Sequence, residues 1–156
     1  MSQYSIYQNK IYQVSIHGQV IHLISSKKEN GFHELIDIVG NKHDDIFIKE
    51  VSLDDVELVY ELKINAVYCG KEFETYGVDS SNLEKKYILL FSMEFEDVND
   101  YGFRKHEQFV YQKQVALDDI DALVEIKKPI LKWENKPETK ITIPNNLIRE
   151  YLSKLC

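Results

Sequence analysis

Two pairs of adjacent carboxylates, Asp54-Asp55 and Asp118-Asp119, are the residues of this chain best suited to chemistry. Paired carboxylates can divide general acid and general base work between them. Each pair, however, follows a strand-like run and begins a turn. Ser52, with Asp55 three residues on, has the spacing of a capping box, in which a serine hydroxyl accepts from an early N–H of the turn. We therefore favour capping over catalysis and expect the first aspartate of each pair to cap a backbone donor, although the second copy has Ala116 at the serine position.

The histidines and cysteines are weaker candidates for a chemical role than the paired carboxylates. His17 and His22 flank a tight turn and can face each other across a hairpin, but a metal site needs a third ligand and supporting partners. Cys69 would be a nucleophile only beside a base, and its place before a glycine indicates an ordinary turn residue. The chain has no Gly-rich phosphate loop, G-x-S-x-G, H-E-x-x-H or C-x-x-C motif. We predict a protein that is not an enzyme and that uses no cofactor or metal.

The acidic stretch EFEDVNDY, residues 94–101, is the sequence feature that is hardest to explain by a purely structural role. In the first copy the turn lysine, Lys10, lies 21 residues before the glycine of the Gly-Phe pair, Gly31. In the second copy the same spacing, from Lys71 to Gly102, is 31 residues. We interpret the stretch as an insertion. Four carboxylates with two aromatics suit contact with a basic partner, and a simple solvated loop stays an open alternative. The candidate partner-binding residues are Glu94, Glu96, Asp97, Asp100 and Tyr101.

These residues lie in a chain that repeats itself. Residues 49–63 match residues 113–127 with seven identical positions, including the Leu-Asp-Asp motif. A Gly-Phe pair precedes the motif in each copy, and such self-similarity determines the architecture. We predict related units at residues 4–63 and 66–127, within a single domain of residues 1–156 that ends in a hairpin and helix at residues 128–156.

Short turn motifs open the copies: Tyr7 to Lys10, Tyr68 to Lys71, and a truncated third from Trp133 to Lys136. Asn or Gly before each lysine tolerates the positive φ that two-residue hairpin turns require. We therefore interpret the three motifs as hairpin turns and Lys10, Lys71 and Lys136 as solvated.

Period-two alternation predicts most of the remaining structure as strands. One helix is predicted at residues 147–155, with Asn146 as N-cap and an apolar stripe on one face. Residues 95–101 fit either a short helix or an acidic loop. The predicted fold class is α+β, dominated by antiparallel sheets with a C-terminal helix. The predicted strands are residues 4–7, 11–16, 20–25, 45–51, 71–77, 86–92 and 107–115, with a long strand after each Leu-Asp-Asp motif.

Composition limits the possible partners. The net charge of −7 disfavours nucleic acid and favours a basic macromolecular partner. No apolar stretch reaches the length of a membrane span, and the N-terminus lacks the pattern of a secretory signal. The two cysteines, Cys69 and Cys156, form no disulfide framework, so we expect a cytoplasmic protein.

The chain combines an acidic, Tyr-rich composition and many predicted strands with three short motifs. These are YxNKxY near the start, Gly-Phe, and K-x-V-x-L-D-D followed by E-[IL]-K. This pattern resembles the small bacterial immunity proteins of polymorphic or contact-dependent growth-inhibition toxin systems. The resemblance implies an antitoxin that binds the C-terminal domain of a cognate toxin and blocks its active site. A basic nuclease domain suits a partner of this charge. The family offers no catalytic residues to transfer.

Two other functions remain open. A duplicated small-ligand or carbohydrate-binding module would use Tyr60, Tyr68, Tyr76 and Trp133 to line a groove. An enzyme would use His43-Asp44 or His106-Glu107 as its acid–base pair.

Overall fold

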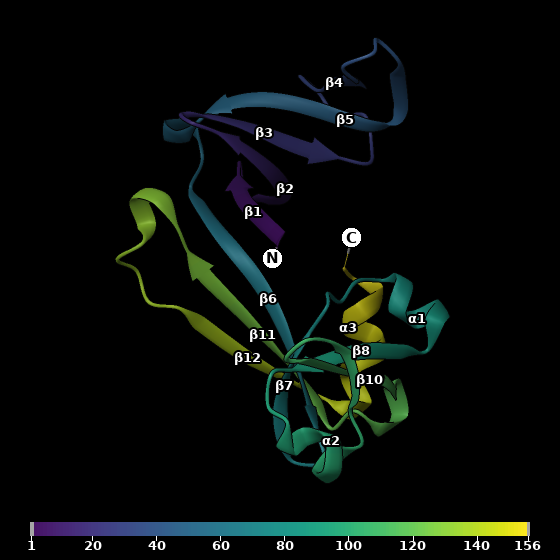
Figure 1. Ribbon diagram of the computed structural model, residues 1–156. Coiled ribbons are helices and arrows are strands. Elements are labelled where there is room, and N and C mark those ends of the chain that lie inside the picture. The colour runs from purple at the N-terminus through teal and green to yellow at the C-terminus, as the bar shows by residue number, and fades with distance from the viewer. Residues whose placement is uncertain (1, 156) are drawn as a thin grey trace. The chain divides into compact units, whose positions relative to one another are not determined.

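The computed structural model describes residues 2–155, so Cys156 lies outside the described residues. Antiparallel strands dominate, with a short helix near the C-terminus (Figure 1), which confirms the predicted β-dominated α+β class. Contacts divide the chain into two compact units: unit 1 is Met1–Leu62 with Lys127–Glu138, and unit 2 is Lys63–Ile126 with Thr139–Cys156. That the two units form a single domain stays a prediction.

Unit 1 is an antiparallel sheet in which neighbouring strands follow the order β4-β5-β3-β2-β1-β6. The first half of β6 pairs with β1, from Leu58 to Leu62. The elements are β1 (Ser2–Tyr7), β2 (Lys10–His17), β3 (Val20–Ser25), β4 (His33–Ile36), β5 (Lys42–Ser52), the 3₁₀ turn η1 (Leu53–Asp55), β6 (Leu58–Tyr68) and the 3₁₀ turn η3 (Leu131–Trp133).

Unit 2 continues from the second half of β6, which pairs with β7 from Ala66 to Tyr68. Its strand order is β6-β7-β8-β10-β9, and β11 pairs with β6 and β12. The elements are β7 (Lys71–Thr75), α1 (Ser81–Lys85), β8 (Tyr87–Ser92), α2 (Glu96–Tyr101), β9 (Arg104–Glu107), β10 (Val110–Ala116), the 3₁₀ turn η2 (Leu117–Asp119), β11 (Ala122–Pro129), β12 (Thr139–Pro144), the 3₁₀ turn η4 (Asn145–Leu147) and α3 (Ile148–Ser153).

The pairing order β1-β2-β3-β5-β4 of unit 1 has the counterpart β6-β7-β8-β10-β9 in unit 2. Single backbone bonds correspond as well. The Leu53 N–H donates to the Gln19 carbonyl at 3.1 Å, and the Leu117 N–H donates to the Lys86 carbonyl at 3.0 Å. In each unit the leucine of the Leu-Asp-Asp turn thus donates to the residue just before the third strand, which is β3 in unit 1 and β8 in unit 2. Full superposition of residues 4–63 on 66–127 stays a prediction.

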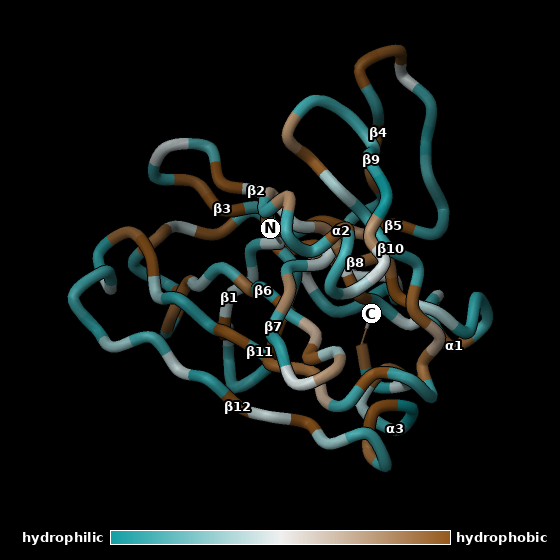
Figure 2. Tube along the Cα trace, turned by 60° about the horizontal axis from the view of Figure 1, so that its bottom comes forward, coloured by the Kyte–Doolittle hydropathy of each residue, from teal (hydrophilic) through white to brown (hydrophobic). Residues whose placement is uncertain are grey.

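Apolar and polar residues alternate along the strands, and successive side chains point to opposite faces of a sheet. The apolar side chains therefore gather on one face and form a core in each unit. Figure 2 shows this as brown and teal segments that alternate along the strands. The core of unit 1 includes the buried residues Tyr12, Val14, Ile21, Leu23, Phe32, Phe47, Val51, Leu53, Val56 and Val59. Buried apolar residues of unit 2 include Phe73, Ile88, Leu90, Phe103, Val115, Leu117, Ile120, Leu123, Ile148 and Leu152.

The Leu-Asp-Asp turn of unit 1 is capped as a capping box. The Asp54 N–H donates to the Ser52 hydroxyl, and the Ser52 N–H donates to the Asp55 carboxylate. The predicted capping box of Ser52 and Asp55 is therefore confirmed. The expectation that the first aspartate also caps is wrong, because Asp54 extends into solvent and pairs with Lys132 at 3.1 Å. Asp118 likewise pairs with Arg149 at the surface of unit 2, at 2.9 Å.

Several elements differ from the sequence prediction. The C-terminal helix is shorter than predicted, and Asn146 is not its N-cap, because a 3₁₀ turn occupies Asn145–Leu147. The Asn145 side chain instead donates to the carbonyl of Ile120 at 2.8 Å, which joins this turn to η2. The short helix α1 and the strand β9 were not predicted, since neither has a strong apolar period. Of residues 95–101, Glu96–Tyr101 form the helix α2, so the helical alternative for this stretch is the observed one.

We expect Leu117→Ala to lower the free energy of unfolding by about 2–5 kcal/mol, because a large side chain that is 1% exposed leaves a cavity. Asp118→Ala is the matched control. It removes only an exposed ion pair and should change stability by less than about 1 kcal/mol. Urea midpoints measure both. Equal midpoints for the two variants would show that the leucine is not part of the core.

Candidate functional site

A buried carboxylate organises the acidic segment of unit 2. Asp97 is 1% exposed. One of its oxygens accepts from the Lys71 ammonium at 2.8 Å, and the other accepts from the Ser92 hydroxyl at the end of β8. Glu94 also accepts from Lys71, at 2.8 Å. Hydrogen bonds to Asp97 and Glu94 raise the pKa of Lys71, so this lysine stays charged.

Unit 1 has a corresponding cluster around Glu29. The carboxylate accepts from the hydroxyls of Ser25 and Tyr12, each at 2.8 Å, and from the Lys10 ammonium at 3.4 Å. Hydrogen bonds from Ser25 and Tyr12 lower the pKa of Glu29. Burial, together with the bond to Glu29, raises the pKa of Tyr12 to about 12. The carboxylate is therefore ionised and the phenol neutral near neutral pH.

Position by position, the clusters match: Lys10 with Lys71, and Ser25 with Ser92, at the same places in their strands. The prediction that these lysines are solvated is wrong for Lys71, whose side chain is 35% exposed and bridges two carboxylates. Lys10 is 68% exposed but still reaches Glu29. In both units the turn lysine ties the loop before Gly-Phe to the first hairpin.

The Gly-Phe motif has a steric explanation in both units. Gly31 and Gly102 have positive φ, +85° and +77°. A Cβ on either glycine would lie 3.0 Å from an ammonium nitrogen, that of Lys49 in unit 1 and that of Lys113 in unit 2. Glycine is favoured because it accepts this backbone conformation and leaves room for the lysine. The following phenylalanine enters the core of its unit.

The structure separates the five predicted partner-binding residues. Glu94, Glu96 and Asp100 are exposed at or near α2. The expectation of surface contact does not hold for Asp97, which is buried against Lys71 and Ser92. Tyr101 is half-buried, with its ring 5.1 Å from that of Phe73 in an edge-on arrangement.

The extra residues of unit 2 lie in two places. In unit 2 the turn lysine and the Gly-Phe pair are separated by ten more residues than in unit 1. Six of them precede Ser92, since Lys71 to Ser92 is 21 positions and Lys10 to Ser25 is 15. These six belong to the connection that contains α1. Only the remaining four belong to the acidic segment, so the interpretation of that segment as the whole insertion is wrong.

Three exposed apolar side chains lie among the exposed carboxylates. Met93 is 70% exposed, Phe95 63% and Phe109 70%. The pairing of Ser92 with Tyr111 places residues 93–95 and Phe109 at the same end of the β8–β10 pair, and the Phe95 ring lies 5.9 Å from that of Tyr111. We call Met93, Glu94, Phe95, Glu96, Asp100 and Phe109 the α2 surface. Phe109 was missed because only strand register brings it there.

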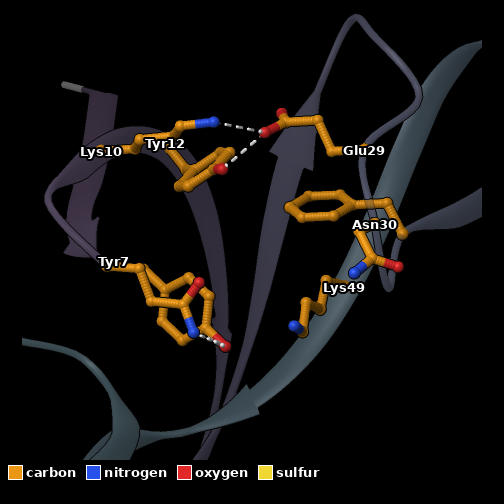
Figure 3. Close-up of a pocket in the computed structure, with 8 residues that line it drawn as sticks. Tyr7, Lys10, Tyr12, Glu29, Asn30 and Lys49 are labelled. Carbon is orange, nitrogen blue, oxygen red and sulfur yellow. Dashed lines mark hydrogen bonds and ion pairs between the residues drawn. The ribbon is translucent and has the colours of Figure 1, made fainter.

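Unit 1 contains a pocket of about 280 Å³ beside its carboxylate cluster. In Figure 3, Lys10 and Tyr12 from β2 converge on Glu29, while Tyr7 and Lys49 lie on the opposite side. The Lys49 ammonium is 5.1 Å from the centre of the Tyr7 ring, a cation–π distance. The pocket is lined by Tyr7, Gln8, Lys10, Tyr12, Glu29, Asn30, Phe32 and Lys49.

The remaining histidine candidates each contact a neighbouring side chain. The rings of His17 and His22 face each other, as predicted, with centres 4.8 Å apart. His43 contacts Asp37 at 3.1 Å, and the His106 ring lies beside Tyr76. Across residues 2–155 no three or more His, Cys, Asp or Glu residues are grouped to hold a metal ion.

The aromatic groove proposed for a carbohydrate-binding module is not formed as expected. Tyr60 is 3% exposed and stacks on Tyr4, with ring centres 5.9 Å apart. A buried ring cannot line an open groove. Trp133 packs against the core of unit 1.

A family model described as "Uncharacterised conserved protein UCP033725" matches residues 1–132, most of the chain. The chain belongs to this family. The match includes both carboxylate clusters, the pocket and the α2 surface. No curated protein and no solved structure matches the chain. In the part of the chain that the structure describes, no helix is long and apolar enough to cross a membrane.

The lowered pKa of Glu29 predicts a pH-dependent contribution to stability. A carboxyl group with a lower pKa in the folded state stabilises the protein above its unfolded pKa, about 4.3, and loses this effect as pH falls through the folded value. Glu29→Gln should therefore destabilise the protein at pH 7 and much less at pH 3. Denaturant midpoints at both pH values measure this difference. Exposed Glu138→Gln is the control, and an equal Glu29→Gln loss at both pH values would contradict the prediction.

Proposed function

We propose that this protein is a cytoplasmic immunity protein that binds the C-terminal domain of a cognate bacterial toxin and blocks its active site. The contact is made by the α2 surface. The observation that carries the proposal is the arrangement of three exposed apolar side chains with three exposed carboxylates in the α2 surface of unit 2.

Apolar anchors surrounded by polar groups are typical of protein-binding surfaces. Large exposed apolar side chains are costly in water, and they become favourable when a partner covers them. Met93, Phe95 and Phe109 fit the role of anchors. The carboxylates around them exclude acidic partners and attract basic ones, which supports a basic toxin domain such as a nuclease.

The charge of the whole chain supports the same partner. A net charge of −7 accelerates association with a basic protein at low ionic strength. Fast association matters for an inhibitor whose target is lethal when free. Stable complexes bury roughly 1,200–2,000 Å² in total, so the α2 surface would form the centre of a larger contact area.

The acidic segment is held firmly before any partner arrives. Asp97 joins it to Lys71 and Ser92, and the Tyr101 ring packs on Phe73. A segment fixed in this way loses little conformational entropy on binding, and that favours high affinity. The buried Asp97 therefore supports the surface without contacting the partner.

Charge reversal tests the electrostatic part of the proposal. The variant Glu94→Lys, Glu96→Lys and Asp100→Lys should associate at least about tenfold more slowly with the toxin domain at low salt, and with a weaker salt dependence. The probe is the C-terminal domain of the toxin encoded next to this chain's gene, measured by surface plasmon resonance. Unchanged association rates at low and high salt would place the interface elsewhere, and no binding by the wild type would end the immunity proposal.

Removing the apolar anchors should act on dissociation instead. Phe95→Ser with Phe109→Ser should raise the dissociation rate about 30-fold or more if each ring is an energetic centre of the interface. The matched control is Ile38→Ser with Val39→Ser, two exposed apolar residues in the loop between β4 and β5 of unit 1. This loop has a brown tip in Figure 2. Loss of binding by the control alone would transfer the interface to unit 1.

A further inference from the structure

We propose that the pocket of unit 1 binds a phenol ring, such as a tyrosine side chain presented by another polypeptide. The inference comes from comparing the two units. Unit 2 places its own Tyr101 against the residues that correspond to the walls of this pocket. Unit 1 has the same walls and no aromatic side chain to place there.

The walls correspond pair by pair. The rings of Tyr12 and Phe32 lie 5.4 Å apart in unit 1, and those of Phe73 and Phe103 lie 4.9 Å apart in unit 2. On the opposite side, Lys49 lies 5.1 Å from the centre of the Tyr7 ring. The counterparts Lys113 and Tyr68 are separated by 5.7 Å.

What differs is the residue before the glycine of the Gly-Phe motif. In unit 2 this residue is Tyr101, whose ring meets the edge of Phe73 at 5.1 Å and lies 5.5 Å from the Lys71 ammonium. In unit 1 the residue is Asn30, which lines the pocket with a short amide side chain. Asparagine has no ring to pack on Tyr12, and about 280 Å³ stays open.

The chemistry of the walls suits a phenol in particular. An incoming ring can pack on Tyr12 as Tyr101 packs on Phe73, and such aromatic pairs prefer edge-on or offset contacts. Lys10, which corresponds to Lys71, can place its ammonium over the face of the ring. The amides of Gln8 and Asn30 and the carboxylate of Glu29 provide hydrogen-bonding groups for the phenol hydroxyl.

The test is a ¹H–¹⁵N NMR titration of the full chain with three probes: p-cresol, the tyrosine peptide Ac-Gly-Tyr-Gly-NH₂ and the leucine peptide Ac-Gly-Leu-Gly-NH₂. We expect saturable shifts at amides of residues 7–12, 29–32 and 49, with a dissociation constant on the order of millimolar for so small a ligand. The leucine peptide should cause none. Binding of both phenols indicates a polypeptide tyrosine, and binding of p-cresol alone indicates a free phenol.

Variants locate the site. Asn30→Tyr supplies the missing ring and should weaken p-cresol binding at least tenfold, while the matched control Asn30→Ser should bind as the wild type does. Lys10→Met removes the cation and should weaken binding about two- to fivefold, which gives a second test if Asn30→Tyr does not fold. Tyr101→Asn should open a corresponding site in unit 2, with new shifts at Lys71 and Phe73. The proposal is overturned if neither phenol gives saturable shifts, or if Asn30→Tyr and Lys10→Met both bind as the wild type does.

Discussion

Each unit of this protein depends on the hydrogen bonds of one carboxylate in the segment that precedes its Gly-Phe pair. Glu29 in unit 1 and Asp97 in unit 2 each accept from a hairpin-turn lysine and from the serine that ends the third strand. Burial of the Asp97 carboxylate would be costly without such donors, and the Glu29 side chain is partly buried, with 27% of it exposed. The bonds therefore tie the segment before each Gly-Phe pair to the first hairpin and to the third strand of its unit.

The same support carries two different surfaces. Glu29 stands two positions before its glycine, whereas Asp97 stands five positions before Gly102. The longer segment winds into α2, and its last residue, Tyr101, turns its ring toward Phe73. Unit 2 thereby gains an acidic surface with apolar anchors, and it fills the space that unit 1 keeps as a pocket. The two proposals therefore rest on one shared arrangement, in which Tyr101 packs on Phe73 in unit 2 and no ring packs at the corresponding place on Tyr12 from Asn30 in unit 1.

The fold class was predictable from the sequence because alternation and turn residues act locally. The spacing of Ser52 and Asp55 correctly predicted a capping box, although Asp54 pairs with Lys132 instead of capping. The site was only partly predictable. Acidic composition identified residues 94–101, but whether a carboxylate faces solvent or a lysine 26 positions earlier, as Asp97 faces Lys71, depends on tertiary packing. Phe109 and the pocket beside Glu29 are likewise products of strand register and loop closure, which no local pattern encodes.

The central claim is that the α2 surface meets a toxin domain. The most direct measurement is hydrogen–deuterium exchange of the full chain, alone and with the toxin domain encoded by the neighbouring gene. Amides buried by a partner exchange more slowly. The account predicts slower exchange in residues 93–101 and 108–111 of the complex. Protection limited to unit 1, or exchange unchanged at a saturating concentration of the toxin domain, would contradict it.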